Sequence, residues 1–225
     1  FYLQRYQQVW GQAELRPLLA SVPSLMMWDD HDIFDGFGSL PDSQQQSALV
    51  QGVFKVARKA FCLFQLGAND DALPGHVMDD SGASLGWALR FGTLGIIAPD
   101  LRSERRRDRV MGPMGWRSLA KGLAEMHHCR HVLFLSSVPL MGAGLNWLER
   151  LICLIPGQQL YQDDLRDQWR SFAHREEWHK LLQVLFSQIN DNRQMTAISG
   201  EIHLGAMAGE VPGAAASGVS REGLG

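Results

Sequence analysis

The chain of 225 residues is poor in cysteine and has no large excess of charge of either sign. Its three cysteines include no Cys-x-x-Cys pair, which excludes a disulfide scaffold and argues against a thiolate zinc site. An odd cysteine count leaves at least one thiol free, which favours a reducing compartment such as the cytoplasm. Lys plus Arg number 21 and Asp plus Glu number 24, so the net charge of −3 predicts no general attraction to nucleic acid or anionic membranes.

Long hydrophobic runs are also missing. The most apolar stretch, residues 132–145, is interrupted by serine, proline and glycine and is too short to span a bilayer. The N-terminus lacks the basic segment and apolar core of a signal peptide. Since the chain begins at Phe1 rather than at a methionine, this second absence carries no information on targeting.

Short apolar runs alternate with segments of helical periodicity, which indicates an α/β fold. A hairpin around Gly92 and Thr93 predicts mixed rather than purely parallel strand pairing. The predicted helices cover residues 1–20, 47–66, 114–126 and 174–189, and the predicted strands cover residues 24–28, 85–91, 94–98, 132–135 and 195–199.

An acidic cluster follows the first apolar run directly. Asp29, Asp30, Asp32 and Asp35 surround His31, so four carboxylates and one imidazole lie within seven residues. Such a concentration of negative charge is unfavourable unless a cation neutralises it, and hard metal ions prefer oxygen ligands with imidazole as a further donor. A solvated acidic turn is the alternative, and the spacing alone does not decide between the two.

Two further segments could contribute to a site at the ends of the strands. Glu201 and His203 are two residues apart and would point the same way on extended backbone, although an ordinary surface pair explains this spacing more simply. Residues 102–107 contain four arginines, for which a solvated loop is the default interpretation. The functional alternative is that Arg102 turns inward to a phosphate and that Asp100 fixes its position.

Residues 28–39, WDDHDIFDGFGS, closely resemble the WDDHDIFDGWGS signature of alkaline phosphatase D-like (PhoD-like) phosphatases, which are divergent calcineurin-like metallophosphoesterases. Other segments are similar to elements of that family in the same order, over residues 1 to about 207. These segments are residues 100–105 (DLRSER), 136–140 (SSVPL), 163–169 (DDLRDQW) and 199–203 (SGEIH).

The resemblance implies a metal-dependent phosphatase or phosphodiesterase that hydrolyses phosphate esters with a metal-activated water. Two or more metal ions are implied, with iron, calcium, manganese and zinc as candidates. The implied metal ligands are Asp29, Asp30, Glu201 and His203, where Glu201 replaces the aspartate usual in the family. His31 would stabilise the transition state or protonate the leaving oxygen, Asp32 would orient His31, and Arg102 would bind the phosphate.

The implied fold is a four-layer α/β-β/α metallophosphoesterase sandwich with mixed sheets, present only in part. The family takes its first ligands from an aspartate and a Gly-Asp-x-x-Tyr element upstream of the acidic signature, whereas no aspartate precedes Asp29 here. We therefore expect an internal fragment of a longer phosphatase, with an incomplete domain over residues 1–207 and a Gly/Ala-rich tail over 208–225. A catalytically inactive binding or structural module is the alternative.

Overall fold

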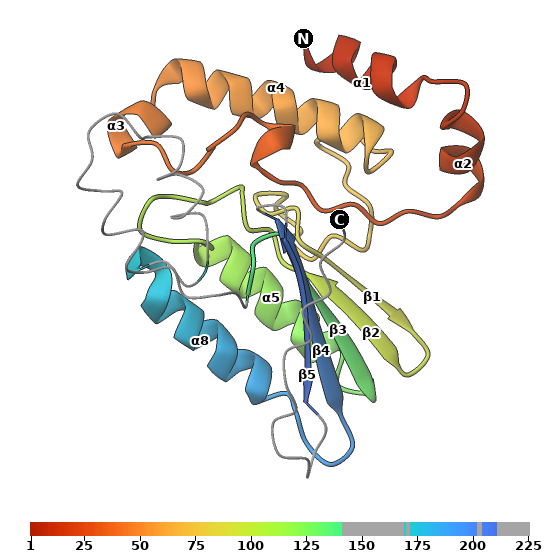
Figure 1. The fold of residues 1–225 in the computed structure, drawn as a ribbon, viewed down its shortest axis with the longest axis vertical. Coiled ribbons are helices and arrows are strands. Elements are labelled where there is room, and N and C mark those ends of the chain that lie inside the picture. The colour runs from red at the N-terminus through yellow and green to blue at the C-terminus, as the bar shows by residue number, and fades with distance from the viewer. Residues whose placement is uncertain (141–168, 170–171, 202–203, 211–225) are drawn as a thin grey trace.

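The structure is a computed structural model that describes residues 1–140, 169, 172–201 and 204–210. Its centre is a sheet of five strands in the order β1-β2-β3-β4-β5 (Figure 1). The neighbours β2, β3 and β4 are parallel, whereas β1 and β5 pair antiparallel at the two edges. The predicted α/β class with mixed pairing is thereby confirmed. The strands are β1 (Trp87–Phe91), β2 (Leu94–Ala98), β3 (His131–Ser136), β4 (Gln194–Glu201) and β5 (Leu204–Glu210).

Helices pack around this sheet, and the longer ones lie where the apolar periodicity predicts them. Ser47 caps α4 by accepting a hydrogen bond from the backbone N–H of Val50, as serine commonly does at a helix start. The predicted helix over residues 1–20 is two helices, because the first ends at Gly11 and the second starts with Pro17 in its first turn. The helices are α1 (Tyr2–Trp10), α2 (Arg16–Ser21), α3 (Asp42–Gln45), α4 (Ala48–Phe64), α5 (Pro113–Glu125) and α8 (Arg175–Phe186), with single 3-10 turns η1 (Asp30–Asp32) and η2 (Phe172–His174).

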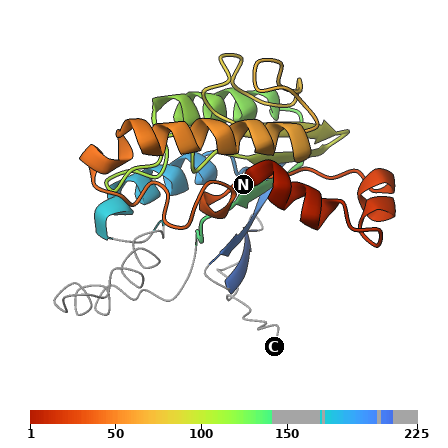
Figure 2. The same ribbon diagram turned by 90° about the horizontal axis from the view of Figure 1, so that it is seen from above.

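The main hydrophobic core lies between the sheet and the helices α5 and α8, which cover one of its faces (Figures 1 and 2). Alternate residues of the strands enter this core, as the period of two of a β-strand requires. The opposite face of the sheet is apolar too, with Leu133 and Leu135 half-buried and Ile198 40% exposed. The core side chains include Ile97, Val132, Phe134 and Met195 from the strands and Leu119, Leu123, Leu181 and Leu185 from the helices.

A second, smaller core joins α4 to the segment that contains the acidic cluster. Trp28, Ile33 and Phe37 pack with Phe61 and Cys62 of α4, and each of these five side chains is at most 3% exposed. The helix α1 lies against the same helix, where the ring of Tyr6 stacks on that of Phe64. Figure 2 shows α1 beside one end of α4. This core therefore fixes the acidic cluster to α4 and not to the centre of the sheet.

The predicted strand over residues 24–28 is wrong. The segment belongs to no strand of the described sheet, and Leu25 is 39% exposed although Trp28 is buried. Trp87 donates a hydrogen bond from Nε1 to the carbonyl of Met26 (2.8 Å), which attaches the segment to the edge strand by a side chain. A short apolar run does not distinguish a buried strand from an extended segment that inserts one large aromatic ring into a core.

The C-terminal part of the described chain extends the sheet. The strand β5 pairs with β4 from Leu204 to Glu210, so it crosses the expected boundary between a domain ending at residue 207 and a tail. Residues 211–225 and most of the segment over residues 163–169 lie outside the described residues. Among the described helices, none combines the length and apolar character needed to cross a membrane.

Candidate metal and phosphate site

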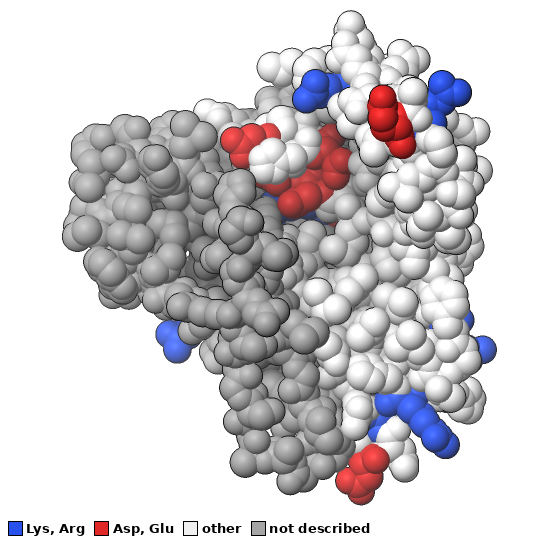
Figure 3. All heavy atoms as spheres, turned by 45° about the vertical axis from the view of Figure 1, so that its right-hand side comes forward, with Lys and Arg blue, Asp and Glu red and all other residues white. Residues whose placement is uncertain are grey.

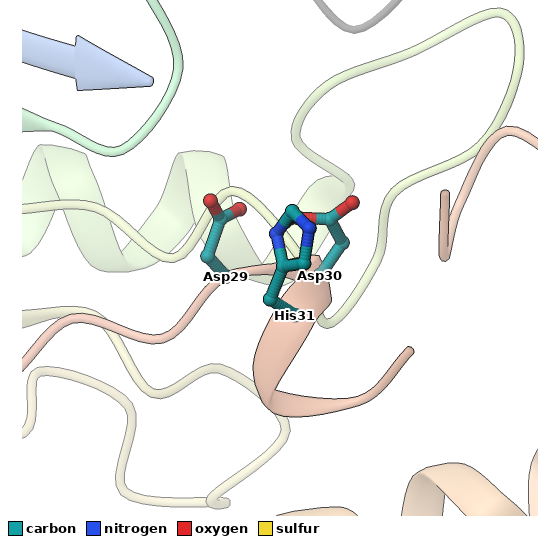
Figure 4. A group of neighbouring side chains, drawn as sticks. All are labelled: Asp29, Asp30 and His31. Carbon is teal, nitrogen blue, oxygen red and sulfur yellow. Dashed lines mark ion pairs between the residues drawn. The ribbon is translucent and has the colours of Figure 1, made fainter. Parts of the chain in front are cut away.

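A single 3-10 turn, η1, holds the acidic cluster in place. Buried Trp28 precedes it and buried Ile33 follows it, so both ends of the turn are anchored in the smaller core. The carboxylate of Asp32 accepts a hydrogen bond from the backbone N–H of Asp29 (3.0 Å) and closes the turn. Figure 4 shows that Asp29, Asp30 and His31 project from this turn toward the same side.

These three side chains could share one metal ion. Each offers a ligand atom, and the three atoms lie within 4.8 Å of one another. Asp30 is 4% exposed, whereas the side chain of His31 is 76% exposed. Figure 3 shows acidic side chains gathered in a hollow on this face of the molecule.

The buried carboxylate of Asp30 is only partly satisfied. Its Oδ2 atom accepts a hydrogen bond from the backbone N–H of Gly36 (2.9 Å). Its Oδ1 atom is buried and accepts no hydrogen bond from the described residues, although Nδ1 of His31 lies 3.2 Å away. An unsatisfied buried carboxylate oxygen is costly, and a bound cation would remove that cost.

Arg102 turns inward and lies beside the same carboxylates. Its guanidinium is fully buried, donates from Nε to Oδ1 of Asp29 and places Nη2 3.6 Å from Oδ1 of Asp30. Arg105, three residues further on, is 2% exposed. The solvated-loop interpretation is therefore wrong for these two arginines, whereas Arg107 is exposed as that interpretation expects.

Asp100 connects the loop after β2 to the acidic cluster. Its Oδ1 atom accepts hydrogen bonds from Nε1 of Trp28 (3.1 Å) and from the backbone N–H groups of Arg102 and Ser103 (2.9 Å each). Its Oδ2 atom accepts from the backbone N–H of Leu85 (2.6 Å) and from the hydroxyl of Ser103. Asp100 therefore fixes the backbone that carries Arg102 and, through Trp28, the residue that precedes Asp29.

Asp32 lies on the other side of the turn, toward the helices. Its Oδ1 atom accepts hydrogen bonds from the hydroxyl of Tyr6 (3.1 Å) and from Nε2 of Gln65 (2.7 Å). Burial raises the pKa of Asp32, and its hydrogen bonds counteract this shift in part. The carboxylates beside the imidazole of His31 are those of Asp30 and, at 3.7 Å from Nε2, Asp35.

No sequence pattern indicates that Tyr6 and Gln65 contact the acidic turn, because one lies in α1 and the other follows α4, both distant from Asp32 along the chain. Their role depends on the packing of these two helices, where the ring of Tyr6 stacks on Phe64 with centroids 4.8 Å apart. No local pattern around either residue predicts a hydrogen bond to a carboxylate more than twenty residues away along the chain.

The second candidate motif begins at the end of β4. Glu201 is the last residue of that strand, and only its backbone is described, while His203 lies outside the described residues. Because β2, β3 and β4 are parallel and Ser136 is in register with Ser199, Glu201 leaves the sheet at the same edge as Asp100. The topology therefore brings Glu201 to the same end of the sheet as Asp100, which contacts the acidic turn through Trp28.

The donor set fits a hard metal ion. Carboxylates are ligands for calcium, manganese, iron and zinc, imidazole suits iron and zinc, and the buried Oδ1 atom of Asp30 is one of the carboxylate oxygens. Three ligand atoms fill only part of a typical coordination shell of such an ion. The remaining ligands would come from elsewhere in the protein or from water.

Comparisons with known proteins identify a family and a relative of the chain. An uncharacterized protein of Saccharomyces cerevisiae, YGR266W, is 23% identical to the chain over 237 residues, which cover 84% of the chain and 33% of the relative. The chain thus spans about a third of the length of this curated relative. No solved structure matches the chain significantly. Residues 1–159, which include η1 and the loop after β2, match the family described as PhoD related phosphatase, and the chain therefore belongs to that family.

Proposed function

We propose that the chain forms part of a metal-dependent phosphoric ester hydrolase. The observation that carries the proposal is the buried, unsatisfied Oδ1 atom of Asp30 beside Asp29 and His31, in a chain of the PhoD related phosphatase family. A structural acidic turn would not need a buried carboxylate oxygen that accepts no hydrogen bond from the described residues. A cation bound by the carboxylates of Asp29 and Asp30 would explain why this arrangement is tolerated.

The metal ligands on this hypothesis are Asp29 and Asp30 together with Glu201 and His203. Asp30 lies in η1 and Asp29 caps it, and the other two belong to the end of β4 and to the residues that follow it. The bound metal would lower the pKa of a coordinated water and polarise the phosphate oxygens. A sandwich of two sheets is part of the proposal, supported by the half-buried Leu133 and Leu135 on the face of the sheet opposite α5 and α8.

His31 and Arg102 would act on the phosphate itself. The imidazole of His31 is exposed at the mouth of the site and lies near the carboxylates of Asp30 and Asp35. A protonated imidazole can donate to a phosphate oxygen or protonate the leaving oxygen. Arg102 is the proposed phosphate-binding group because its planar guanidinium fork suits both a carboxylate, as at Asp29, and a phosphate.

Asp32 would act through the turn and not on the substrate. It binds the backbone N–H of Asp29 and the side chains of Tyr6 and Gln65, and so holds the first ligand in place. Its proposed role is therefore to position η1, from which His31 also projects. The raised pKa of Asp32 agrees with a buried group that contacts protein on several sides.

A catalytically inactive module is a second candidate, and one observation favours it. Arg102 already places a positive charge beside Asp29 and Asp30, so the acidic cluster can be neutralised without a metal ion. On this alternative the ion pair is structural and the chain binds no metal tightly. Calorimetric titration of chelator-treated protein with Mn²⁺ and Zn²⁺ separates the two, because tight binding contradicts the inactive module.

The enzymatic test uses p-nitrophenyl phosphate and bis-p-nitrophenyl phosphate, with metals added back after chelation. Asp30→Asn and His31→Ala should abolish the metal-dependent hydrolysis, since one removes a ligand charge and the other the proton donor. Asp108→Asn and His128→Ala are matched controls at exposed positions and should leave it unchanged. Hydrolysis that survives in both site variants would overturn the assigned roles.

A further inference from the structure

A separate cavity of about 250 Å³ lies between the loop after β2 and the start of α4. Its lining shares no residue with the acidic cluster and includes Arg105, Arg106 and Arg109 but one carboxylate, that of Glu104. The guanidinium groups of Arg106 and Arg109 make the described lining rich in positive charge. The volume is just below the roughly 300–1,000 Å³ typical of small-molecule sites, so the cavity has room for more than a single inorganic anion.

Two of these arginines are held opposite each other by the backbone. Arg106 and Arg109 form an antiparallel bridge in which each N–H donates to the other's carbonyl (3.0 and 3.2 Å). Side chains of such a pair project from the same face, and like charges placed there repel each other. Asp42 lies 3.9 Å from Arg106 but is 73% exposed, so it screens this repulsion weakly. An anion between the two guanidinium groups would relieve it.

The rest of the lining supplies both hydrogen-bonding and apolar surface. Arg109 is fixed through Nε by the carbonyl of Glu104 (3.1 Å). Phe37 and Phe54 form an apolar wall with their rings stacked at 5.3 Å between centroids. Gln45 is 4% exposed, and its Oε1 atom is buried and accepts no hydrogen bond from the described residues. A ligand that carries a hydroxyl group beside its anionic group would satisfy this amide oxygen.

We propose that this cavity binds a small phosphomonoester that carries hydroxyl groups. Arg106 and Arg109 bind the phosphate, and Gln45 accepts a hydrogen bond from a ligand hydroxyl. A phosphate dianion matches two opposed guanidinium groups in charge and in the number of oxygens that each fork can engage. The site is independent of metal binding, because none of its lining residues belongs to the candidate metal ligands.

The test is calorimetric titration of the chelator-treated chain with glycerol 2-phosphate, inorganic phosphate and glycerol. We expect one molecule of glycerol 2-phosphate to bind per chain, inorganic phosphate to bind more weakly, and glycerol not to bind. Arg106→Gln and Arg109→Gln should each weaken binding by about tenfold or more, because each removes a charge-assisted hydrogen bond. Gln45→Met should weaken the binding of glycerol 2-phosphate but leave the binding of inorganic phosphate unchanged.

Arg107→Gln is the matched control, because Arg107 lies in the same turn but is exposed and outside the cavity lining. It removes the same charge from the chain and should leave binding unchanged. No saturable binding of either phosphate, or equal weakening in Arg107→Gln, would overturn the proposal. Loss of binding in His31→Ala with retention in the Arg106→Gln and Arg109→Gln variants would also overturn it, since the anion would then occupy the acidic site.

Discussion

The acidic cluster and the arginine-lined cavity carry opposite charge, yet the same loop after β2 contributes an arginine to each. Arg102 of this loop lies against Asp29, whereas Arg106 faces the cavity together with Gln45. The acidic cluster consists of consecutive residues in one helical turn, whereas the cavity combines the loop with α3 and α4. A cluster of charge formed by neighbouring residues can be recognised in the sequence. A cluster formed by residues from separate segments can be recognised only in the tertiary structure.

The largest effect is expected from Asp100, which fixes the start of the loop that carries arginines to both regions. Asp100→Ala removes the acceptor of five hydrogen bonds, three of them from buried or half-buried backbone N–H groups. Unsatisfied buried donors cost about 1–3 kcal/mol each, so we expect a loss of roughly 3–5 kcal/mol in the free energy of unfolding. Urea denaturation measures it. Asp108→Ala, at an exposed position of the same loop, should change stability little, and equal losses in both variants would contradict the role of Asp100.

The next prediction concerns the acidic cluster alone. Arg102→Met leaves the carboxylates of Asp29 and Asp30 without the guanidinium, and breaking a buried ion pair costs about 3–5 kcal/mol. If a metal ion binds these carboxylates, saturating Mn²⁺ should recover part of that loss in thermal or urea denaturation. Arg58→Met removes another buried arginine paired with an aspartate, Asp70, and is the control that Mn²⁺ should not rescue. If Arg102→Met lowers the free energy of unfolding by the same amount with and without Mn²⁺, that result would contradict a cation beside Asp29.

A third change acts on the cavity through the packing of Arg105. Gly38 has a positive φ of 98°, and a Cβ atom there would overlap Cγ and Cβ of Arg105. Gly38→Ala combines this overlap with an unfavourable backbone conformation, so we expect a loss of about 3 kcal/mol and weaker binding of glycerol 2-phosphate. Gly67 also has a positive φ, 61°, but no described atom lies within 4 Å of its Cβ position. Gly67→Ala should therefore lower the free energy of unfolding by only about 1 kcal/mol. Equal losses of unfolding free energy in Gly38→Ala and Gly67→Ala would show that the overlap with Arg105 is unimportant.

The smallest effect concerns the smaller core that anchors the acidic turn. Burial raises the pKa of the Cys62 thiol from 9.0 to about 11, and Asp70 adds to the shift while Arg58 opposes it. The folded chain therefore keeps this proton at pH values where the unfolded chain loses it. The resulting stabilisation is complete below pH 9.0 and disappears as the pH rises to about 11, a change of about 2 kcal/mol.

Cys62→Ala should remove this alkaline component of the stability. Urea denaturation at pH 8 and pH 10.5 should show the wild-type chain losing more stability than the variant over this interval. Cys129→Ala also deletes a buried thiol and serves as the control for lost packing. A stability loss between the two pH values that is the same in the wild type and in Cys62→Ala would contradict the burial argument.

The helices around the core could be predicted because each depends on a repeat of apolar residues over several turns. The helix α8 has this pattern at Leu181 and Leu185, which the structure buries. The segment over residues 24–28, wrongly predicted as a strand, has no comparable repeat. Five apolar residues are compatible with a strand and equally with an extended segment outside a sheet. What placed this segment was the indole of Trp28, which packs on Phe61 and donates to Asp100.

The sequence by itself determined the acidic turn, because Asp29, Asp30 and His31 are adjacent and a single turn suffices to bring their ligand atoms together. Only the tertiary structure decided which charges are buried. The arginines of the loop look alike in sequence, yet Arg102 lies among carboxylates, Arg106 borders a cavity and Arg107 is exposed. The physical reason is that a charge is buried only where other segments supply groups of opposite charge or hydrogen-bond partners, and those segments are distant along the chain.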